Sequence, residues 1–173
     1  MSTDDASLTP TSAPNSSKRN TLILIGCMVV GVGMFVALPV VGILAAVAIP
    51  NFVAMELKSK RAEVPGNVDG LKTAELAYDA AFDGYQSVGS ATEGRYLLGR
   101  EPHSFLDQDT ADFDKIGWQP DGMVRGIYWV VVTDGGRDFE VHGICDVDGD
   151  GQYAEYVATR ETNATMVSPY DVY

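Results

Sequence analysis

A long uncharged and apolar segment near the N-terminus is the feature that most limits how this chain can fold. The 29 residues from Thr21 to Ile49 include no Asp, Glu, Lys or Arg. A membrane-spanning helix needs about 20 apolar residues, and a 29-residue helix is about 44 Å long, which exceeds the ~30 Å hydrocarbon core of a bilayer. We therefore predict one transmembrane helix over residues 21–50.

A polar segment, residues 1–20, precedes this helix and is rich in Ser, Thr and Pro. It has too few apolar residues to form a core, so we expect a disordered tail. A cleavable signal peptide fits less well, because its apolar stretch is shorter and begins closer to the N-terminus. The segment Leu24–Cys27 looks like a lipoprotein lipobox, but the hydrophobic character continues more than twenty residues beyond Cys27. Lys and Arg flank the apolar run on both sides, so the positive-inside rule does not decide the orientation.

The remainder of the chain is strongly acidic. The net charge is −12, from 24 acidic and 12 basic residues, and the charges of residues 1–20 cancel. The segment after the apolar run therefore carries the whole net charge. Such a surface repels phosphate backbones, so we expect no nucleic-acid partner. The two cysteines, Cys27 and Cys145, lie far apart in segments of different character, and we expect no disulfide between them.

Small residues recur at four-residue spacing within the apolar segment. Such pairs allow helices to approach closely in lipid, although Gly and Ala are also common in membrane helices generally. Pro39 lies in the middle of the segment and is expected to kink the helix or loosen its preceding turn. The candidate helix-packing residues are Gly33, Ala37, Gly42, Ala46 and Pro50.

A helical pattern continues beyond the apolar run. Residues 51–64 read as an amphipathic helix, and Pro65-Gly66 is expected to break or kink it. One face of the resumed helix, to about residue 85, should carry Leu71, Ala74, Tyr78, Ala81, Phe82 and Tyr85. We interpret this stripe as covering a sheet, with a contact between subunits as the alternative.

The C-terminal half is predicted to form a sheet. Residues 86–122 have weak periodicity and read as a connecting loop region. Residues 127–133 are rich in β-branched and aromatic side chains, which is typical of a strand. Residues 134–137 have the composition of a hairpin turn, and mostly apolar and polar side chains alternate along residues 139–145. A third strand is predicted over residues 153–159, so residues 123–160 are expected to form an antiparallel sheet of three strands, or of four with one more strand from the connecting region. From residue 162 we expect a loose tail. The fold class is therefore α+β, and residues 51–173 form one globular domain.

An acidic glycine-containing loop is the strongest candidate for a site. Asp146, Asp148 and Asp150 alternate before Gly151, as in the first half of a calcium-binding loop. The Gln152 carbonyl and Glu155 can add oxygens, although the closing glutamate of an EF-hand would fall at Val157. The alternative is a hairpin turn that needs only residues tolerant of left-handed conformations.

The sequence offers no support for catalysis. His103 and His142 are isolated, and His142 is expected to be a solvated residue on a strand. No nucleophile elbow, P-loop or paired-cysteine metal site is present. Cys145 is expected to be a small packed residue. We therefore expect that the chain is not an enzyme.

The segment Gly42–Phe52 resembles the N-terminal helix of type IV pilins and pseudopilins, in which a Gly-Ile-Leu-Ala-Ala run leads to a proline and an aromatic residue. In that family a basic, amphipathic stretch then follows, which corresponds here to Lys58–Glu63. The later segments Gly117–Gly122 and Cys145–Gly151 resemble pilin-like proteins of the deltaproteobacterial type. The resemblance implies a long N-terminal helix whose lower half packs on the sheet, and it adds that calcium sites occur in the C-terminal region of some pseudopilins.

The same resemblance implies a structural subunit or minor component of a type IV pilus or type II secretion-like filament. The chain would sit in a bacterial inner membrane as a single-pass protein, with its C-terminal domain periplasmic or at the cell surface and other pilin-like subunits as partners. By the family spacing, the processing junction would fall at Met28-Val29 and the assembly glutamate at Gly33, and neither motif is present. The alternative is a membrane-anchored domain that binds calcium or a partner and does not polymerise.

Overall fold

The computed structural model describes residues 16–108, 110 and 112–173. The chain divides into two compact units at the bond between Pro50 and Asn51, and each unit is considered by itself. The predicted disordered tail, residues 1–20, lies outside the described residues as far as residue 15. Residues 16–20 are already helical.

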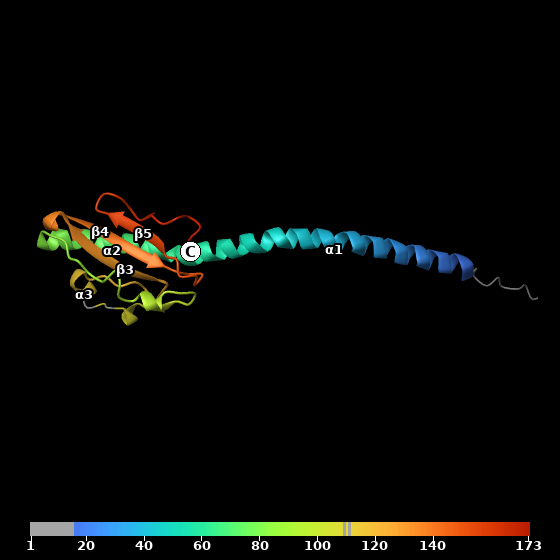
Figure 1. The fold of residues 1–173 in the computed structure, drawn as a ribbon, viewed down its shortest axis with the longest axis horizontal. Helices are drawn as coiled ribbons and strands as arrows, with labels where there is room; N and C mark the ends of the chain where they lie inside the picture. Colours follow the sequence, from blue (N-terminus) through green and yellow to red (C-terminus); the bar gives the residue numbers. More distant parts are fainter. Residues whose placement is uncertain (1–15, 109, 111) are drawn as a thin grey trace, which may run out of the picture. The chain divides into compact units, whose positions relative to one another are not determined.

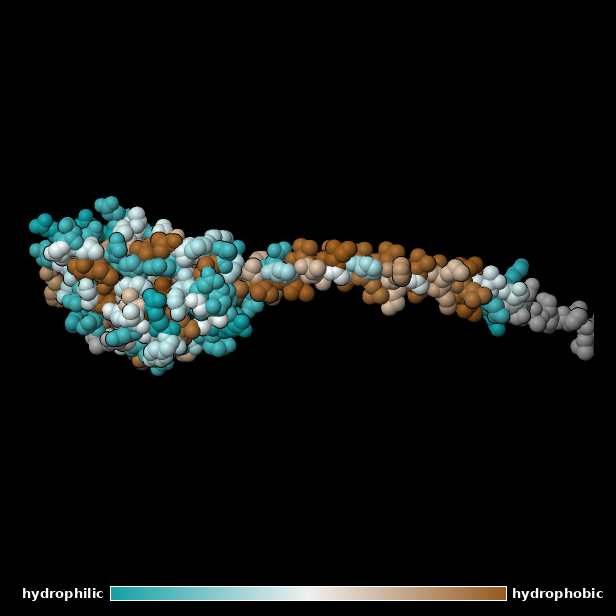
Figure 2. Space-filling model, viewed as in Figure 1, coloured by the Kyte–Doolittle hydropathy of each residue, from teal (hydrophilic) through white to brown (hydrophobic). Residues whose placement is uncertain are grey.

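The first unit consists, in its described part, of helix α1, Ser16–Arg61, which continues into the second unit (Figure 1). One helix of the described chain is long and apolar enough to cross a membrane, as judged by length and composition. Its most apolar 18 residues have a mean hydropathy of 2.6, and none of them is buried. Figure 2 shows hydrophobic residues along much of this helix. Pro39 and Pro50 both lie inside α1.

The interruption that we expected at Pro65-Gly66 lies a few residues earlier. Helix α1 ends at Arg61, helix α2 spans Glu63–Phe82, and Pro65 lies in the first turn of α2. Proline has no N–H to donate to the carbonyl four residues before it, and its ring crowds that carbonyl. The carbonyl concerned belongs to Arg61, so the break appears at the end of α1 and not at the proline itself.

Helix α2 packs on the sheet through a face that begins further upstream than the sequence stripe. The buried residues of the helix are Val64, Val68, Leu71, Lys72 and Glu75. Ala74, Tyr78 and Tyr85 are partly buried against the same core, as expected. Ala81 and Phe82 are exposed, which is contrary to our expectation. The helix ends there, because Asp83 adopts a left-handed conformation with φ 58°.

The sheet has four antiparallel strands in the order β3-β4-β5-β6, which confirms the predicted α+β class. Figure 1 labels β3, β4 and β5 of this sheet. The strands are β3, Gly126–Thr133; β4, Asp138–Cys145; β5, Ala154–Thr159; and β6, Thr165–Met166. The fourth strand comes from the C-terminal segment and not from the connecting region. The connecting region contributes a single bridge, in which Val130 N–H donates to Val88 O over 2.8 Å at the other edge.

The connecting region and the two residues after it contain short elements that periodicity did not indicate. They are η1, Arg95–Leu97; β1, His103–Ser104; η2, Phe105–Asp107; α3, Phe113–Ile116; and β2, Met123–Val124. Strands β1 and β2 pair as a separate two-stranded sheet. Phe105, Phe113 and Trp118 form an aromatic cluster, with ring centroids 5.1 to 5.6 Å apart. This cluster allows a region with few regular hydrogen bonds to be ordered by side-chain packing.

The C-terminal segment is not the loose tail that we expected. The backbone N–H of Val147 donates to Tyr173 O over 3.2 Å, and Val172 and Tyr173 pack against the core. Arg61 is 4% exposed, and its guanidinium donates to the backbone carbonyls of Tyr170 and Val172. These contacts tie the end of the chain to the end of α1.

Candidate functional site

The candidate site is the loop of residues 146–153 that joins β4 to β5. The last residue of β4, Cys145, pairs with the first residue of β5, Ala154, so the chain must reverse within this loop. Gly149 and Gly151 adopt positive φ angles of 70° and 83°, a conformation that glycine adopts without strain. The glycines of the acidic motif are therefore explained by the turn itself.

Asp146 holds this loop closed from inside. Its side chain is 5% exposed. Its carboxylate accepts three backbone N–H groups: from Gly149 and Asp150 to Oδ1, over 2.7 and 3.1 Å, and from Gly151 to Oδ2, over 3.0 Å. The loop is thus ordered by hydrogen bonds that require no cation.

The two following aspartates lie beside Asp146. One ligand atom from each of Asp146, Asp148 and Asp150 can be chosen so that all three lie within 4.8 Å of one another, so this partly buried group can hold a metal ion. Asp150 accepts the backbone N–H of Gln152 over 2.8 Å and its side-chain amide over 2.9 Å. Asp148 Oδ1 is buried and has no hydrogen-bond partner among the described residues. Desolvation, and then the neighbouring Asp150, raise the pKa of Asp148.

Glu155 is not brought into this group. It lies on β5, where its Oε1 is 3.3 Å from His142 Nδ1. His142 also lies 3.4 Å from Glu140 and stacks on Trp129 at 5.0 Å between ring centroids, so its side chain is only 16% exposed. The expectation of a solvated histidine is therefore wrong, because the outer face of the sheet carries an apolar cluster of its own, built on Ile127, Trp129 and Ile144.

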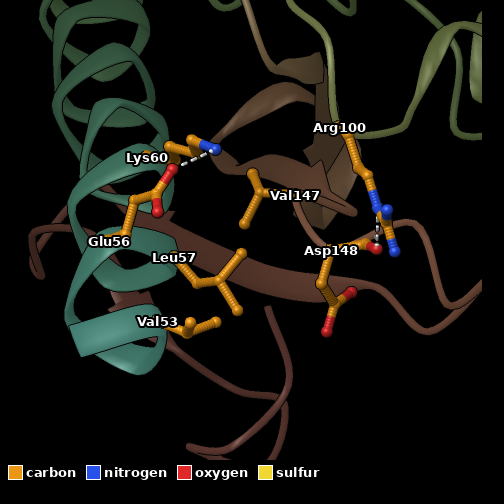
Figure 3. A pocket seen from close by; sticks show the side chains of 7 residues that line it. All are labelled: Val53, Glu56, Leu57, Lys60, Arg100, Val147 and Asp148. Carbon is orange, nitrogen blue, oxygen red and sulfur yellow. Dashed lines mark hydrogen bonds and ion pairs between the residues drawn. The ribbon is translucent and has the colours of Figure 1, made fainter. Parts of the chain in front are cut away.

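A groove borders the acidic loop within the second unit (Figure 3). One wall is the end of α1, with Val53 and Leu57, and with Glu56 and Lys60 paired over 2.8 Å. Figure 3 shows the Leu57 and Val147 side chains pointing toward each other, with Asp148 and Arg100 on the far side. The lining residues are Val53, Glu56, Leu57, Lys60, Arg100, Val147 and Asp148, and the groove holds about 290 Å³.

Arg100 is the residue of this site that sequence reasoning missed. Its Nε donates to Asp148 O over 2.6 Å, and Arg125 donates to Arg100 O over 2.6 Å. Arg100 lies 48 residues before Asp148 in the chain. No local motif marks such a contact, because it depends on how the connecting region folds back.

The expected packing role of Cys145 is confirmed, since this residue is fully buried in the core. Cys27 and Cys145 are both free thiols. Burial raises the pKa of its thiol to about 12, so the thiol stays protonated beside the acidic loop. A protonated thiol is a poor metal ligand, and the loop therefore offers oxygen atoms alone.

The predicted helix-packing residues lie in the first unit. A Cβ added at Gly33 or Gly42 would meet no atom within 4 Å beyond the backbone of its own helix, and Pro50 ends this unit inside α1. Ala37 is exposed, as is Ala46. The helix surface around these residues is thus available, and their role in packing stays a prediction.

Comparison with known proteins gives one informative similarity. The chain is 35% identical over 57 residues to the type IV major pilin protein PilA of Myxococcus xanthus (strain DK1622). The match covers 33% of this chain and 26% of the pilin, so it spans about a quarter of the length of this relative. No family profile matches the chain, and no solved structure matches it significantly.

The match is to a structural protein, in agreement with the non-enzymatic character expected from the sequence. Helix α2 packs on an antiparallel sheet, and a long apolar helix precedes it, as the resemblance implied. Over part of its length the chain is therefore distantly similar to a type IV pilin, and its long apolar helix and its helix packed on an antiparallel sheet have a pilin-like arrangement.

Proposed function

We propose that this chain is a structural subunit or minor component of a type IV pilus or type II secretion-like filament. The observation that carries the proposal is helix α1, whose apolar residues are exposed to such an extent that they require a membrane or other helices around them. In this proposal residues 21–50 cross a bacterial inner membrane once. The C-terminal domain lies in the periplasm or at the cell surface.

Lateral association through α1 supplies the driving force in this proposal. The pairs Gly33/Ala37 and Gly42/Ala46 allow the backbones of neighbouring helices to approach closely, where van der Waals contacts accumulate. Pro50 follows these pairs inside the same helix. Two other pilin-like properties, processing and export into a fibre, are part of the proposal and are tested by one experiment.

The experiment is the intact mass of the native protein, measured from membranes and from sheared surface material. A chain that begins at Val29 in the sheared fraction supports processing and assembly. A full-length chain that is confined to membranes contradicts assembly and favours a domain that remains anchored.

The second candidate function is a membrane-anchored domain that binds calcium or a partner and does not polymerise. The specific observation in its favour is the group of Asp146, Asp148 and Asp150, together with the buried and unpartnered oxygen of Asp148. Calcium prefers six to eight oxygen ligands. The hydrogen bonds that Asp146 already accepts favour a structural loop, so calcium binding is the weaker proposal.

A further inference from the structure

Helix α1 carries more apolar surface than a bilayer can cover. No charged residue occurs between Arg19 and Glu56, a helical length of roughly 54 Å. A helix tilted by about 40° crosses a ~30 Å hydrocarbon core with about 26 residues. Several uncharged residues must therefore lie outside the hydrocarbon. At the end that leads into the second unit, Phe52 and Met55 are 69% and 70% exposed.

These two residues belong to a stripe that ends in a basic residue. Phe52, Met55 and Lys58 are three residues apart and therefore lie on one side of the helix. The Lys58 ammonium lies 4.7 Å from the centre of the Tyr170 ring. Among the described residues no carboxylate oxygen lies within 4.0 Å of it. We call these three residues the donor stripe.

The groove beside the acidic loop has the complementary character. Its apolar lining consists of Val53, Leu57 and Val147, and the Asp148 carboxylate stands at its edge (Figure 3). The other charged residues that line the groove are Glu56 and Lys60, which pair with each other, and Arg100, which donates to the backbone carbonyl of Asp148. The groove holds about 290 Å³, which leaves room for protein side chains to enter it.

The donor stripe and the groove lie on roughly opposite sides of α1. At about 100° per residue, the helix positions of Val53, Glu56, Leu57 and Lys60 are centred some 150° away from those of Phe52, Met55 and Lys58. One molecule therefore cannot fill its own groove with its own stripe. A contact between them is heterologous, and heterologous contacts form rings or open filaments, whereas a two-fold dimer uses the same patch twice.

We propose that the donor stripe of one copy of this chain docks in the groove of the next copy, with Lys58 facing Asp148. Phe52 and Met55 then cover Val53, Leu57 and Val147, and the ammonium forms an ion pair with the Asp148 carboxylate at the edge of the groove. The charge pair also fixes the register between two neighbouring copies along the helix axis. The uncharged part of α1 has no charged group that could fix this register. This inference rests on the proposed function and names the surfaces through which neighbouring copies meet.

The test is a charge-reversal cycle in the full-length protein in its native membrane. Association between copies is measured by chemical crosslinking or energy transfer for wild type, Lys58→Asp, Asp148→Lys and the double variant. Each single reversal is expected to weaken association on the order of tenfold, because like charges then face each other, and the double variant should restore it. Asp121→Lys, at an exposed residue that does not line the groove, changes the net charge equally and should associate as wild type does.

A second pair of variants tests the apolar part of the contact. Val53→Asp should weaken association, whereas Leu106→Asp, at an exposed apolar residue outside the groove, should not. Circular dichroism on each variant verifies folding, and Asp148→Asn replaces Asp148→Lys if the lysine disturbs the loop. If wild type associates but neither the cycle nor Val53→Asp has an effect, the docking contact is refuted and the proposed function stands. If wild type does not associate at all, both are refuted.

Discussion

The Arg61 guanidinium donates a hydrogen bond to the backbone carbonyl of Tyr170 over 3.2 Å, across 109 residues of sequence. It also donates to Val172 O, and it lies 5.0 Å from the centre of the Tyr173 ring. The last residue of α1 is therefore the point to which the end of the chain is attached.

Arg61→Ala should destabilise the second unit by about 2 to 4 kcal/mol, because it leaves two carbonyls without their donor and removes packing against two tyrosine rings. Urea denaturation measures this loss, and limited proteolysis should show earlier cleavage after residue 165. Lys60→Ala is the matched control. It removes an exposed ion pair with Glu56 and should cost less than about 1 kcal/mol. Equal losses in the two variants would show that Arg61 has no special role.

Glu75 should make stability depend on pH. Its side chain is fully buried, Oε2 accepts the backbone N–H of Gln86 over 3.0 Å, and Oε1 has no partner among the described residues. Desolvation raises the pKa of Glu75 to about 7 from an ordinary 4.5. The folded state therefore holds this proton more tightly than the unfolded state, so this contribution to stability is complete below pH 4.5 and is lost as the pH rises through 7.

Glu75→Gln should remove that dependence. The variant should match wild type near pH 4.5 and exceed it above pH 7 by on the order of 1 to 3 kcal/mol, since a neutral amide can still accept from Gln86. Unfolding free energies at several pH values test this directly. A wild-type and a variant profile that remain parallel between pH 4.5 and 8 would contradict the assignment.

Asp146 and Asp148 should contribute differently to the stability of the acidic loop. Asp146→Ala leaves three backbone N–H groups without their acceptor and should lower the melting temperature even without calcium. Asp148→Ala removes a carboxylate whose buried oxygen has no partner among the described residues, and it should be much less harmful in calcium-free buffer.

Calcium at millimolar concentration should raise the melting temperature of the full-length protein in detergent if the loop binds it, and Asp148→Ala should abolish the increase. Magnesium at the same concentration is the control for ionic strength. An unchanged wild-type melting temperature would leave the loop with a structural role alone.

Gly143 should not tolerate a side chain. A Cβ at this residue of β4 would lie 2.5 Å from Val68 Cγ2 and 3.0 Å from Val64 Cγ1, both on α2. Gly143→Ala should therefore cost about 1 to 3 kcal/mol in the free energy of unfolding. Gly66→Ala is the matched control on the facing helix. No atom lies within 4 Å of its Cβ, and it should be neutral or stabilise by up to about 1 kcal/mol. A harmless Gly143→Ala would mean that helix and sheet are not in close contact there.

Local patterns were sufficient for the main elements of the fold. The uncharged run predicts a long apolar helix, because about 20 consecutive apolar residues are typical of a helix that crosses a membrane. The β-branched residues before and after Asp134–Gly136 predict the hairpin of β3 and β4. The acidic loop could also be located from the sequence, since alternating Asp residues followed by Gly are typical of a tight turn or of a calcium-binding loop.

Other features depend on residues that are distant in sequence. The predicted apolar stripe of α2 begins at Leu71, whereas the buried face of the helix begins at Val64 and Val68. These two residues lie on either side of Pro65, which indicated a break in the helix. The fourth strand was expected before the hairpin, yet it comes from Thr165–Met166, whose two residues carry no strand signal until they meet the open edge of β5.

The sequence alone therefore determined the apolar helix, the antiparallel hairpin and the acidic turn, because each depends on near neighbours in the chain. Only the tertiary structure decided that Asp146 is saturated by backbone donors, that Glu155 pairs with His142, and that Arg100 and the C-terminal residues close around the loop. The physical reason is that hydrogen bonds and burial are satisfied by whichever groups the fold brings within reach, and separation along the chain does not limit that choice.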